Sequence, residues 1–576
     1  MSRIAAAGLL LFFAAGLVAT GGAQENFFVS NAGSDANPGT ESLPWRTVQH
    51  ACNVLPAGAT VHVKAGIYSE KVTVNVSGSQ AAGFVTVRNY EDDDVVLDGT
   101  GVAGDNMFYL ENREYVRIRG FEIRNNLDVS DGSGIRVTGW ADHIELIANS
   151  IHDIRGSDAM GITVYGNSLR PIRHLVVDSN LVYDCDPAHS EALTLNGNVD
   201  SFQVTHNTVY GVNNIGIDFI GFEEVCPDSS QDYARHGICR WNTVYNCHSV
   251  YDSSAAGIYV DGASCMSIEN NRVSDCDFGI EVGCEHRGKE TREVLVANNL
   301  VYANDKSGIA FGGYRRRAGR VTDCEFRGNT CCFNDRKADG GGELLVQWAS
   351  NNLVRNNLLR SGPSDLVLAN WDEGSSVDNR LDYNLWHGPP TASFVWNGEE
   401  YAGFEAYRTA TGQDSCSLFA DPRLVAPDSS PPDFRLRFDS PAVDRADPSF
   451  VADSGETDLD GFPRISGGRC DIGVYEYRSP AIKEAPAGRM GVADMSVPWL
   501  LGSGSSEVRF KLRAQARVRL GIYDATGRRL AVLADLSLPA GEHKAEVPAR
   551  ALPAGVCFCV LRAGPALVVR RTTVVR

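Results

Sequence analysis

Asparagine recurs at the ends of short, strand-like runs through most of the chain, and this recurrence limits the possible folds more than any other feature. A repeat of this length cannot enclose a core of its own and becomes stable only by stacking on its neighbours. Asparagine also tolerates the left-handed backbone of a tight corner, and stacked amides can hydrogen-bond to one another. The pattern predicts a parallel β-helix of about ten coils between roughly residues 85 and 390. The recurring positions, 24–35 residues apart, are Asn125, Asn149, Asn180, Asn207, Asn242, Asn271, Asn299, Asn329, Asn357 and Asn384.

A second repeated phrase, most often Gly-Ile, marks one strand in each coil. Strand side chains alternate between the two faces of a sheet, so the aliphatic residue of the phrase should point inward and the next residue outward. The expected inward column is Ile135, Ile162, Leu193, Ile217, Ile258, Ile280 and Ile309. The expected outward column is Arg136, Thr163, Thr194, Asp218, Tyr259, Glu281 and Ala310. Two residues further on lies a second outward column that includes Asn196 and Asp261.

The ends of the chain differ from the repeats. Residues 1–23 have a basic start, an apolar run and a small-residue stretch, as a secretory signal does. They predict a protein that is secreted or held at the cell surface. No other segment is apolar over the length that a bilayer requires. Residues 45–55 have apolar positions at helical spacing, and we expect a capping helix at the N-terminal end of the solenoid.

The remaining boundaries follow from composition. We expect residues 24–480 to form the β-helix with its capping segments, and the Ala/Pro/Gly-rich residues 481–498 to form a linker. Residues 499–576 alternate again between glycine turns, which predicts a small C-terminal β-sandwich. The whole chain is thus expected to be all-β.

The fifteen cysteines follow two patterns. Cys226 and Cys239 flank a long insertion, and export would permit a disulfide between them. Cys185, Cys247 and Cys276 each come five residues after a repeat asparagine. We expect these three to stack on one inner face as small core residues.

The cadence of the repeats and the opening FFVSNAGSDANPGTESLPWRTVQHA, followed by AGIYSEKVTV, resemble the right-handed parallel β-helix proteins of the pectate-lyase superfamily over residues 25–480. The resemblance implies a right-handed solenoid and a polysaccharide partner. That superfamily includes lyases, hydrolases, epimerases and non-enzymatic surface proteins. Residues 499–576 resemble the immunoglobulin-like C-terminal modules that bacterial exported proteins carry for sorting or surface attachment. This second likeness implies an extracellular bacterial location and contact with secretion or cell-surface machinery.

Acidic side chains gather on three successive coils. Coils of a β-helix stack about 4.8 Å apart, so Asp218, Tyr259, Asp261 and Glu281 are expected to share one exposed patch. Stacked carboxylates repel one another and require protonation, a cation or a basic partner. Asp218, Asp261 and Glu281 could hold Ca²⁺, for which carboxylate oxygens are suitable ligands. A solvated charged face would explain the same pattern without any chemistry.

Two loops are expected to wall this patch. One contains Glu285, His286, Arg287 and Lys289, and the other, on the next coil, contains Tyr314, Arg315, Arg316, Arg317 and Arg320. The insertion between Ile220 and Cys239, which contains Glu223 and Glu224, is expected to overhang the patch. The candidate catalytic residues are Asp218, Tyr259, Asp261, Glu281, His286 and Arg287. The candidate substrate-binding residues are Glu191, Arg235, Lys289, Tyr314 and Arg315.

Charge and chemistry together favour a polysaccharide-active enzyme. The net charge of −19 argues against nucleic acid as a partner. β-Elimination on a uronic acid needs a neutralised carboxylate, a base and an acid, and the patch with its loops offers all three. The favoured function is therefore a lyase for an acidic polysaccharide, acting as a monomer. The alternatives are a glycoside hydrolase that uses paired carboxylates, and a surface protein that binds carbohydrate without cleaving it.

Overall fold

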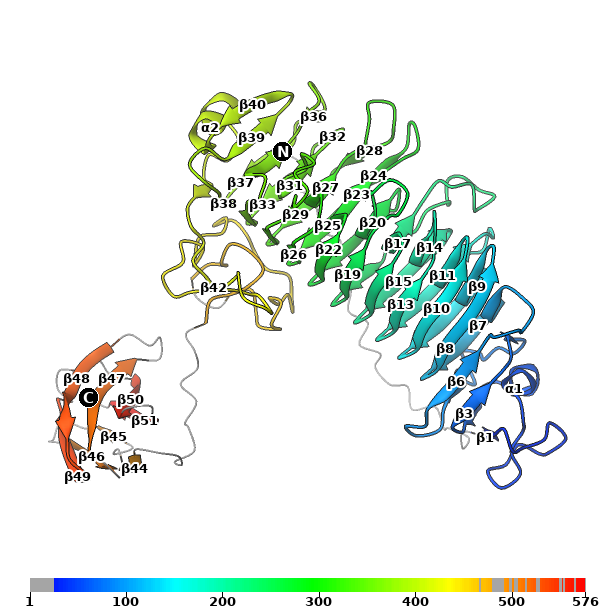
Figure 1. Cartoon of the computed structure of the whole chain (residues 1–576), viewed down its shortest axis with the longest axis horizontal. Coiled ribbons are helices and arrows are strands. Elements are labelled where there is room, and N and C mark those ends of the chain that lie inside the picture. Colours follow the sequence, from blue (N-terminus) through cyan, green and yellow to red (C-terminus); the bar gives the residue numbers. More distant parts are fainter. Residues whose placement is uncertain are drawn as a thin grey trace. The chain divides into compact units, whose positions relative to one another are not determined.

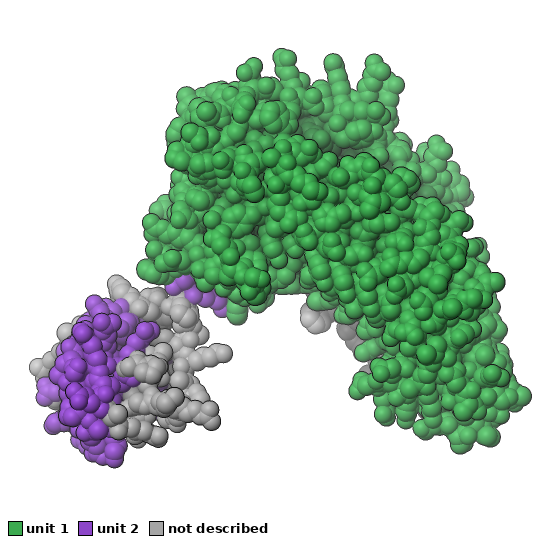
Figure 2. Space-filling view, viewed as in Figure 1, with its two compact units in different colours: residues 1–476 green, residues 477–576 purple. Residues whose placement is uncertain are grey.

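The computed structural model describes residues 25–465 and 468–478, and shorter stretches between 492 and 574. The chain divides into two compact units, residues 1–476 and 477–576, which are drawn in different colours in Figure 2. The predicted signal segment, residues 1–23, lies outside the described residues. The described helices are too short or too polar to cross a membrane.

The first unit is a β-solenoid of about 12 turns, built from parallel strands stacked coil on coil (Figure 1). One ladder carries the candidate site and is called the site ladder below. It contains β4 (Val72–Thr73), β7 (Asn106–Arg119), β9 (Gly132–Ile147), β11 (Ala159–Gly166), β14 (Glu191–Gly197), β17 (Ile215–Ile220), β20 (Ala256–Asp261), β23 (Phe278–Gly283), β27 (Ser307–Phe311), β31 (Leu344–Val346), β35 (Leu366–Ala369) and β39 (Ser393–Trp396).

Two further ladders complete each coil. The long strands β7 and β9 bend and also join the second ladder, which contains β1 (Asn26–Val29), β2 (Thr60–Val63), β5 (Val85–Asn89), β12 (Ile172–Asp178), β15 (Val199–Thr205), β18 (Ile238–Arg240), β21 (Met266–Glu269), β25 (Val294–Ala297), β29 (Glu325–Arg327), β33 (Leu353–Arg355) and β37 (Arg380–Asp382). The third ladder contains β3 (Gly66–Tyr68), β6 (Val95–Asp98), β8 (Glu122–Val129), β10 (Ser150–Gly156), β13 (Leu181–Cys185), β16 (Thr208–Val212), β19 (Thr243–Cys247), β22 (Arg272–Cys276), β26 (Leu300–Tyr302), β30 (Thr330–Cys332), β34 (Leu358–Arg360), β38 (Leu385–His387) and β41 (Leu418–Phe419). A short outer sheet joins β24 (Glu290–Arg292), β28 (Arg320–Thr322), β32 (Ala349–Ser350) and β36 (Ser376–Val377).

The predicted inward column is confirmed. Backbone pairing aligns Ile217 with Ile258, Ile258 with Ile280, and Ile280 with Ile309. The same register continues towards the N-terminus through Leu193 and Ile162. All seven side chains of the column are at most 2% exposed. The register of the outward column is therefore also as expected.

The asparagine ladder is confirmed for nine of the ten predicted positions, from Asn149 to Asn384. In a typical step, the backbone N–H and the Nδ2 of Asn242 both donate to Oδ1 of Asn271, at 2.9 and 3.0 Å. Asn271 in turn donates to Oδ1 of Asn299 at the same two distances. Asn125 is the exception: the backbone of Phe121 occupies the ladder position in its coil, and Asn125 bonds the carboxylate of Asp98 instead.

The solenoid has more coils than the ten expected because the asparagine pattern is absent from its first turns. Strands β1, β2 and β5 already stack in parallel before residue 90. The expected capping helix is α1 (Val48–Val54), which begins at the N-cap Thr47 and buries Val48, Ala51 and Cys52 in the main core. Thr47 Oγ1 accepts a hydrogen bond from the N–H of His50, as an N-cap side chain does.

The C-terminal end of the solenoid is closed by aromatic packing. β40 (Glu399–Ala402) pairs antiparallel with β39, and α2 (Phe404–Thr411) follows. The Tyr407 ring stacks on Phe394 with centroids 5.0 Å apart. β42 (Leu424–Ala426) and β43 (Asp433–Leu436) then form a small antiparallel pair.

The chain next runs back along the side of the solenoid as a strap, residues 446–476. The Nδ2 of Asn270 and of Asn298 donate to Thr457 O and Glu456 Oε1, at 3.1 and 2.8 Å. The guanidinium of Arg327 pairs with the same Glu456 carboxylate. On the next coil the backbone N–H of Asp447 donates to Asn356 Oδ1 at 2.7 Å. The strap therefore crosses four successive coils.

The described residues of the second unit form two sheets. One joins β44 (Val492–Ser496), β46 (Ser506–Leu512) and β49 (Gly541–Val547), and the other joins β45 (Leu500–Leu501), β47 (Ala516–Asp524), β48 (Arg529–Leu538), β50 (Gly555–Ala563) and β51 (Ala566–Val574). Residues of both sheets share one hydrophobic cluster. The strand β44 falls inside the segment that was expected to be a linker. The assignment of residues 499–576 as an immunoglobulin-like sandwich stays a prediction.

One of the two cysteine predictions is confirmed and the other is wrong. Cys247 and Cys276 pair in register, and Cys185 is buried in the same ladder, so the inner stack is confirmed. The predicted link between Cys226 and Cys239 is wrong, because all fifteen cysteines, each in a described stretch, are free thiols. Cys226 lies beside the carbonyl of Ser168, while Cys239 faces the solenoid core.

Candidate functional site

Strand pairing brings the predicted acidic residues together on the site ladder. Asp218 of β17 pairs with Tyr259 of β20, and Tyr259 pairs with Glu281 of β23. Asp261 lies at the end of β20, opposite Gly283. Glu191 opens β14, the preceding strand of the same ladder. These five residues, Glu191, Asp218, Tyr259, Asp261 and Glu281, are called the acid cluster below.

The acid cluster is buried except for the half-buried Glu281, which corrects the expectation of an exposed patch. Asp218 is 2% exposed, Asp261 6% and Tyr259 7%. Two segments lie over the strands: the β17–β18 loop, residues 221–237, and the β23–β24 loop, residues 284–289. Sequence alternation gave the face of each side chain correctly. It could not give the depth, because depth depends on how these two loops fold over the ladder.

Burial raises the pKa of every carboxyl group in the cluster, and none of these groups forms an ion pair among the described residues. Burial, then the neighbouring carboxylate of Glu285, raises the pKa of Glu281 to about 8. Burial, and next the nearby carboxylate of Glu223, raises the pKa of Glu191 to about 7. The pKa values of Asp218 and Asp261 lie well above their ordinary value, chiefly through burial and then through the other acids. At neutral pH the cluster therefore contains protonated carboxyl groups that can donate hydrogen bonds.

The two loops complete the wall of the cluster. The backbone N–H of Glu285 donates to Asp261 Oδ1 at 3.0 Å, and the Tyr259 hydroxyl donates to Glu285 Oε1 at 3.4 Å. His286 Nε2 lies 3.3 Å from Glu223 Oε1, which connects one loop to the other. Burial, followed by the nearby carboxylates, holds the pKa of the Tyr259 hydroxyl well above its ordinary value, so it keeps its proton.

The sequence prediction missed two features of this site. Glu223 and Glu285 were expected only as parts of loops, although both carboxylates act on the cluster directly. The amide of Asn196 was not selected because it carries no charge, although it stands in the second outward column. Its Oδ1 is buried without a hydrogen-bond partner among the described residues, and so is Oδ1 of Asp218.

The predicted basic residues do not enter the acid cluster. Arg235 is buried beside Asp200 and donates to Asn198 Oδ1 at 2.9 Å. The Lys289 ammonium lies over the Phe222 ring, 4.7 Å from its centroid. Arg287 is exposed on the β23–β24 loop. Tyr314 and Arg315 are exposed and stack on each other, with the Arg315 Cζ 4.9 Å from the Tyr314 centroid.

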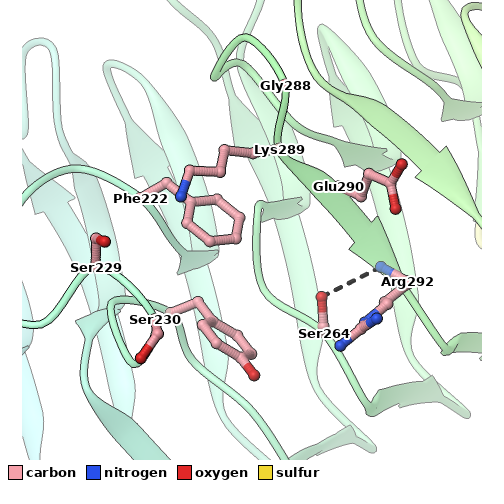
Figure 3. Close-up of a pocket in the computed structure, with 9 residues that line it drawn as sticks. Phe222, Ser229, Ser230, Ser264, Gly288, Lys289, Glu290 and Arg292 are labelled. Atoms are coloured by element: carbon pink, nitrogen blue, oxygen red, sulfur yellow. Dashed lines mark hydrogen bonds between the residues drawn. The ribbon is translucent and has the colours of Figure 1, made fainter.

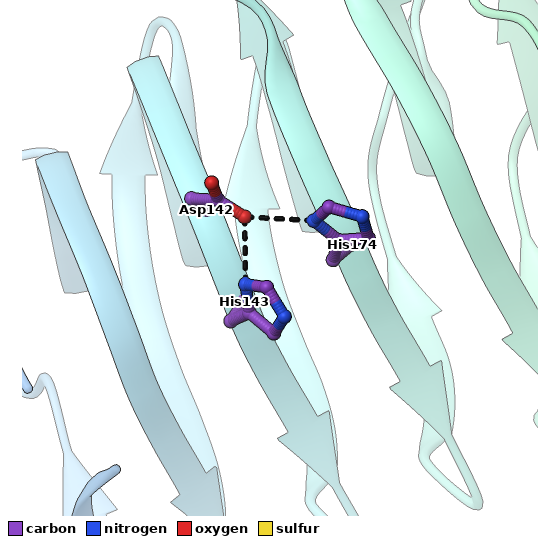
Figure 4. Close-up of side chains that lie close together, drawn as sticks. All are labelled: Asp142, His143 and His174. Atoms are coloured by element: carbon purple, nitrogen blue, oxygen red, sulfur yellow. Dashed lines mark hydrogen bonds and ion pairs between the residues drawn. The ribbon is translucent and has the colours of Figure 1, made fainter. Parts of the chain in front are cut away.

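The donor set of Asp218, Asp261 and Glu281 suits a hard cation because it consists of carboxylate oxygens, one of them without a partner. Their oxygens do not all lie within 4.8 Å of one another, whereas the ligand atoms of two other groups in the described chain do. Asp142, His143 and His174 do converge, as Figure 4 shows: the Nδ1 atoms of both histidines lie 2.7 and 2.8 Å from Asp142 Oδ1. His248, Asp277 and Asp305 form the other convergent group. There the cationic side chains of Arg336 and Lys337 already neutralise Asp305, at 2.7 Å each.

Fold and site together define a right-handed parallel β-helix protein with a buried acid cluster on one ladder. The family model described as "Pel9A-like, right handed beta helix region" matches residues 27–221, and that of the right-handed β-helix region matches residues 192–380. The uncharacterized protein YwoF of Bacillus subtilis (strain 168) is 37% identical over 441 residues, which cover 73% of this chain and 92% of YwoF. The chain belongs to this family of right-handed β-helix proteins, and the expected superfamily is confirmed.

More distant likenesses concern parts of the chain or the fold alone. Pectate lyase PEL9 of Emericella nidulans is 32% identical over 115 residues, covering 17% of this chain and 28% of PEL9. The crystal structure of pectate lyase Pel9A covers 79% of this chain and 96% of its own, with 13% identity and a TM-score of 0.38.

Proposed function

We propose that the protein is a polysaccharide lyase that cleaves a uronate-containing chain by β-elimination at the acid cluster. The observation that carries this proposal is the burial of Asp218 and Asp261 beside the Tyr259 hydroxyl, with the half-buried Glu281 on the next strand and no ion pair to any of the three carboxyl groups among the described residues. The name of its partial relative, pectate lyase PEL9, points to the same class of substrate.

Protonated carboxyl groups can neutralise the carboxylate of a bound uronic acid by donating hydrogen bonds to it. Neutralisation makes the proton on C5 of the sugar more acidic. If a Ca²⁺ ion is bound by Asp218, Asp261 and Glu281, it would supply the same neutralisation as a Lewis acid. In either case the chain provides an oxygen-lined, buried site for the substrate carboxylate.

The remaining steps are assigned to His286 and Tyr259. When Nε2 of His286 donates to Glu223, Nδ1 is left as a base, and this nitrogen has no partner among the described residues. It accepts the C5 proton, the electron pair forms the double bond between C4 and C5, and the bond from C4 to the leaving oxygen breaks. The Tyr259 hydroxyl, which is protonated at neutral pH, gives its proton to that oxygen.

The test is incubation of the purified protein with a panel of acidic and neutral polysaccharides. We expect an ultraviolet-absorbing unsaturated uronic acid at the new chain ends of an acidic polymer. Reducing sugar without that absorbance would indicate a glycoside hydrolase, for which a buried carboxyl of raised pKa next to the exposed Glu285 supplies an acid and a base. Absence of any cleavage, together with measurable binding, would favour a carbohydrate-binding surface protein.

A chelator separates the two ways of neutralising the substrate. Loss of activity in EDTA that is restored by Ca²⁺ would assign neutralisation to the metal. Full activity in EDTA would assign it to the protonated carboxyl groups.

Export, a monomeric state and the sorting role of residues 499–576 are further parts of the proposal. Antibody detection of the mature chain in the culture medium or on intact cells tests the location. Size-exclusion chromatography with light scattering tests the monomeric state.

A further inference from the structure

A pocket of about 280 Å³ lies between the β17–β18 loop and the β23–β24 loop (Figure 3). Its size is near the lower limit of ~300 Å³ for small-ligand clefts, which suits one sugar unit better than a long oligosaccharide. It is lined by Phe222, Ser229, Ser230, Tyr233, Ser264, Gly288, Lys289, Glu290 and Arg292. None of these residues belongs to the acid cluster.

Two cations line the pocket without a carboxylate partner. In the described part of the chain, no carboxylate oxygen is paired within 4.0 Å with the Lys289 ammonium or the Arg292 guanidinium. The Lys289 ammonium is positioned over the Phe222 ring at 4.7 Å, and the backbone N–H of Arg292 donates to Ser264 Oγ at 3.2 Å.

The other lining groups match the rest of a sugar. Phe222 and Tyr233 form an aromatic pair with centroids 5.7 Å apart, and rings of this kind pack against the apolar C–H face of a pyranose. The hydroxyl groups of Ser229, Ser230 and Ser264 can exchange hydrogen bonds with sugar hydroxyls. Cations, aromatic rings and hydroxyls in one cavity are groups that recognise an anionic monosaccharide unit. One carboxylate, that of the exposed Glu290, also lines the pocket.

The pocket adjoins the acid cluster. Glu223 follows Phe222 directly and contacts His286, while Lys289 of the same β23–β24 loop contacts Phe222. The two contacts between the loops thus separate the acid cluster on one side from the cationic pocket on the other. A polysaccharide that reaches the acid cluster would pass neighbouring sugars close to this partition.

We propose that the pocket is a subsite for a second uronic acid unit of the substrate, held through its carboxylate by Arg292 and Lys289. The inference rests on the proposed function and adds to it a selection for polymers with more than one acidic unit. Arg292 can bind the carboxylate in a bidentate manner, which Lys289 supports as a point charge.

Binding measurements test this subsite without using catalysis. In an Asp261→Asn background, in which turnover is expected to be about 100-fold slower or more, titration calorimetry is run with a short oligogalacturonate and with its methyl ester. We expect the acidic oligosaccharide to bind at least about tenfold more tightly than the ester, and Arg292→Ala to remove that preference. Arg320→Ala is the matched control, because Arg320 is an exposed arginine on the next coil that does not line the pocket.

Three outcomes would overturn the proposal: no binding of the acidic oligosaccharide, equal binding of the ester, or unchanged affinity in Arg292→Ala with an intact melting curve. The proposed function fails separately, if no polymer is cleaved. A protein that binds the acidic oligosaccharide through Arg292 and cleaves nothing would retain the subsite and lose the lyase assignment. If the protein cleaves polymer but the Arg292→Ala variant binds the acidic oligosaccharide as tightly as its parent, the lyase assignment would stand and the subsite would be rejected.

Discussion

Single carboxyl groups in the acid cluster differ in protonation because they differ in neighbours as well as in burial. Asp261 receives one backbone hydrogen bond from Glu285 and faces three other acids. Glu281 lies closer to Lys306, whose charge partly offsets the effect of Glu285. Carboxyl groups of raised pKa therefore lie at the depth of the cluster, and the exposed Glu285 lies at its edge.

The first residue-level prediction concerns Glu281 and stability. Its pKa is about 8 in the native state against an ordinary value of 4.5, so the native state binds more protons than the unfolded state between these pH values. The free energy of unfolding should therefore fall as pH rises through this window. Glu281→Gln should flatten the dependence and raise the free energy of unfolding at pH ~8 by about 1–2 kcal/mol. Urea denaturation of both proteins at several pH values measures this free energy. If it depends on pH in the same way in both proteins, the prediction is wrong.

The second residue-level prediction concerns activity. Asp261→Asn keeps the acceptor for the Glu285 N–H but removes a carboxyl that is proposed to neutralise the substrate carboxylate, so kcat/KM should fall by about 100-fold or more. Glu224→Gln is the control, since Glu224 is exposed on the β17–β18 loop outside the cluster. Equal activity of Asp261→Asn and the parent on the cleaved polymer would exclude Asp261 from catalysis.

At the scale of elements, the asparagine ladder explains how much of the fold could be predicted. A side chain that bonds its own copy in the next coil must recur once per coil, so the sequence displays the register directly. Asn125 shows the limit, since it has the left-handed φ of 57° but bonds Asp98 and not the ladder. The loops over the acid cluster lack any repeat. Their packing depends on single contacts such as His286 with Glu223, which no periodicity reveals.

The element-level prediction is that Asn271→Ala destabilises the solenoid by about 3–5 kcal/mol. The change removes the acceptor for two donors of Asn242 and the donor to Cys239 O, all of them buried. The midpoint of urea denaturation, followed by circular dichroism, measures the loss. Asn246→Gly is the control: this residue is exposed at the neighbouring corner with a φ of 54°, and its replacement should cost under about 1 kcal/mol.

At the scale of the whole molecule, the boundary between the two units falls after Glu476, four residues before the end of the predicted β-helix domain. Each unit has its own hydrophobic cluster, and no described residue is shared between the two clusters. Composition located this division because alternating strands resume after a Pro- and Gly-rich stretch. It did not reveal β44 within that stretch, since five residues without a repeat carry little signal.

The molecule-level prediction is that the units fold separately. Residues 25–478 should keep the polymer cleavage and melting temperature of the longer chain, because the acid cluster and its loops lie entirely in the first unit. Residues 477–576, which include β44, should give a soluble β protein with a cooperative melting transition in circular dichroism. A disordered product from residues 477–576, or loss of activity in residues 25–478, would show that the units depend on each other.

The strap, residues 446–476, has a consequence for how the solenoid responds to force. A stack of coils pulled at its ends can unzip one coil at a time, because each coil is held only by its neighbours. The bonds from Glu456 and Asp447 to Asn298, Arg327 and Asn356 tie several coils to one continuous segment. Those coils must then rupture together, so an optical-trap trace should show small regular steps from the N-terminal coils and a single large step from the strapped ones. Under shear, such a solenoid would lose its early coils first and keep the strapped block.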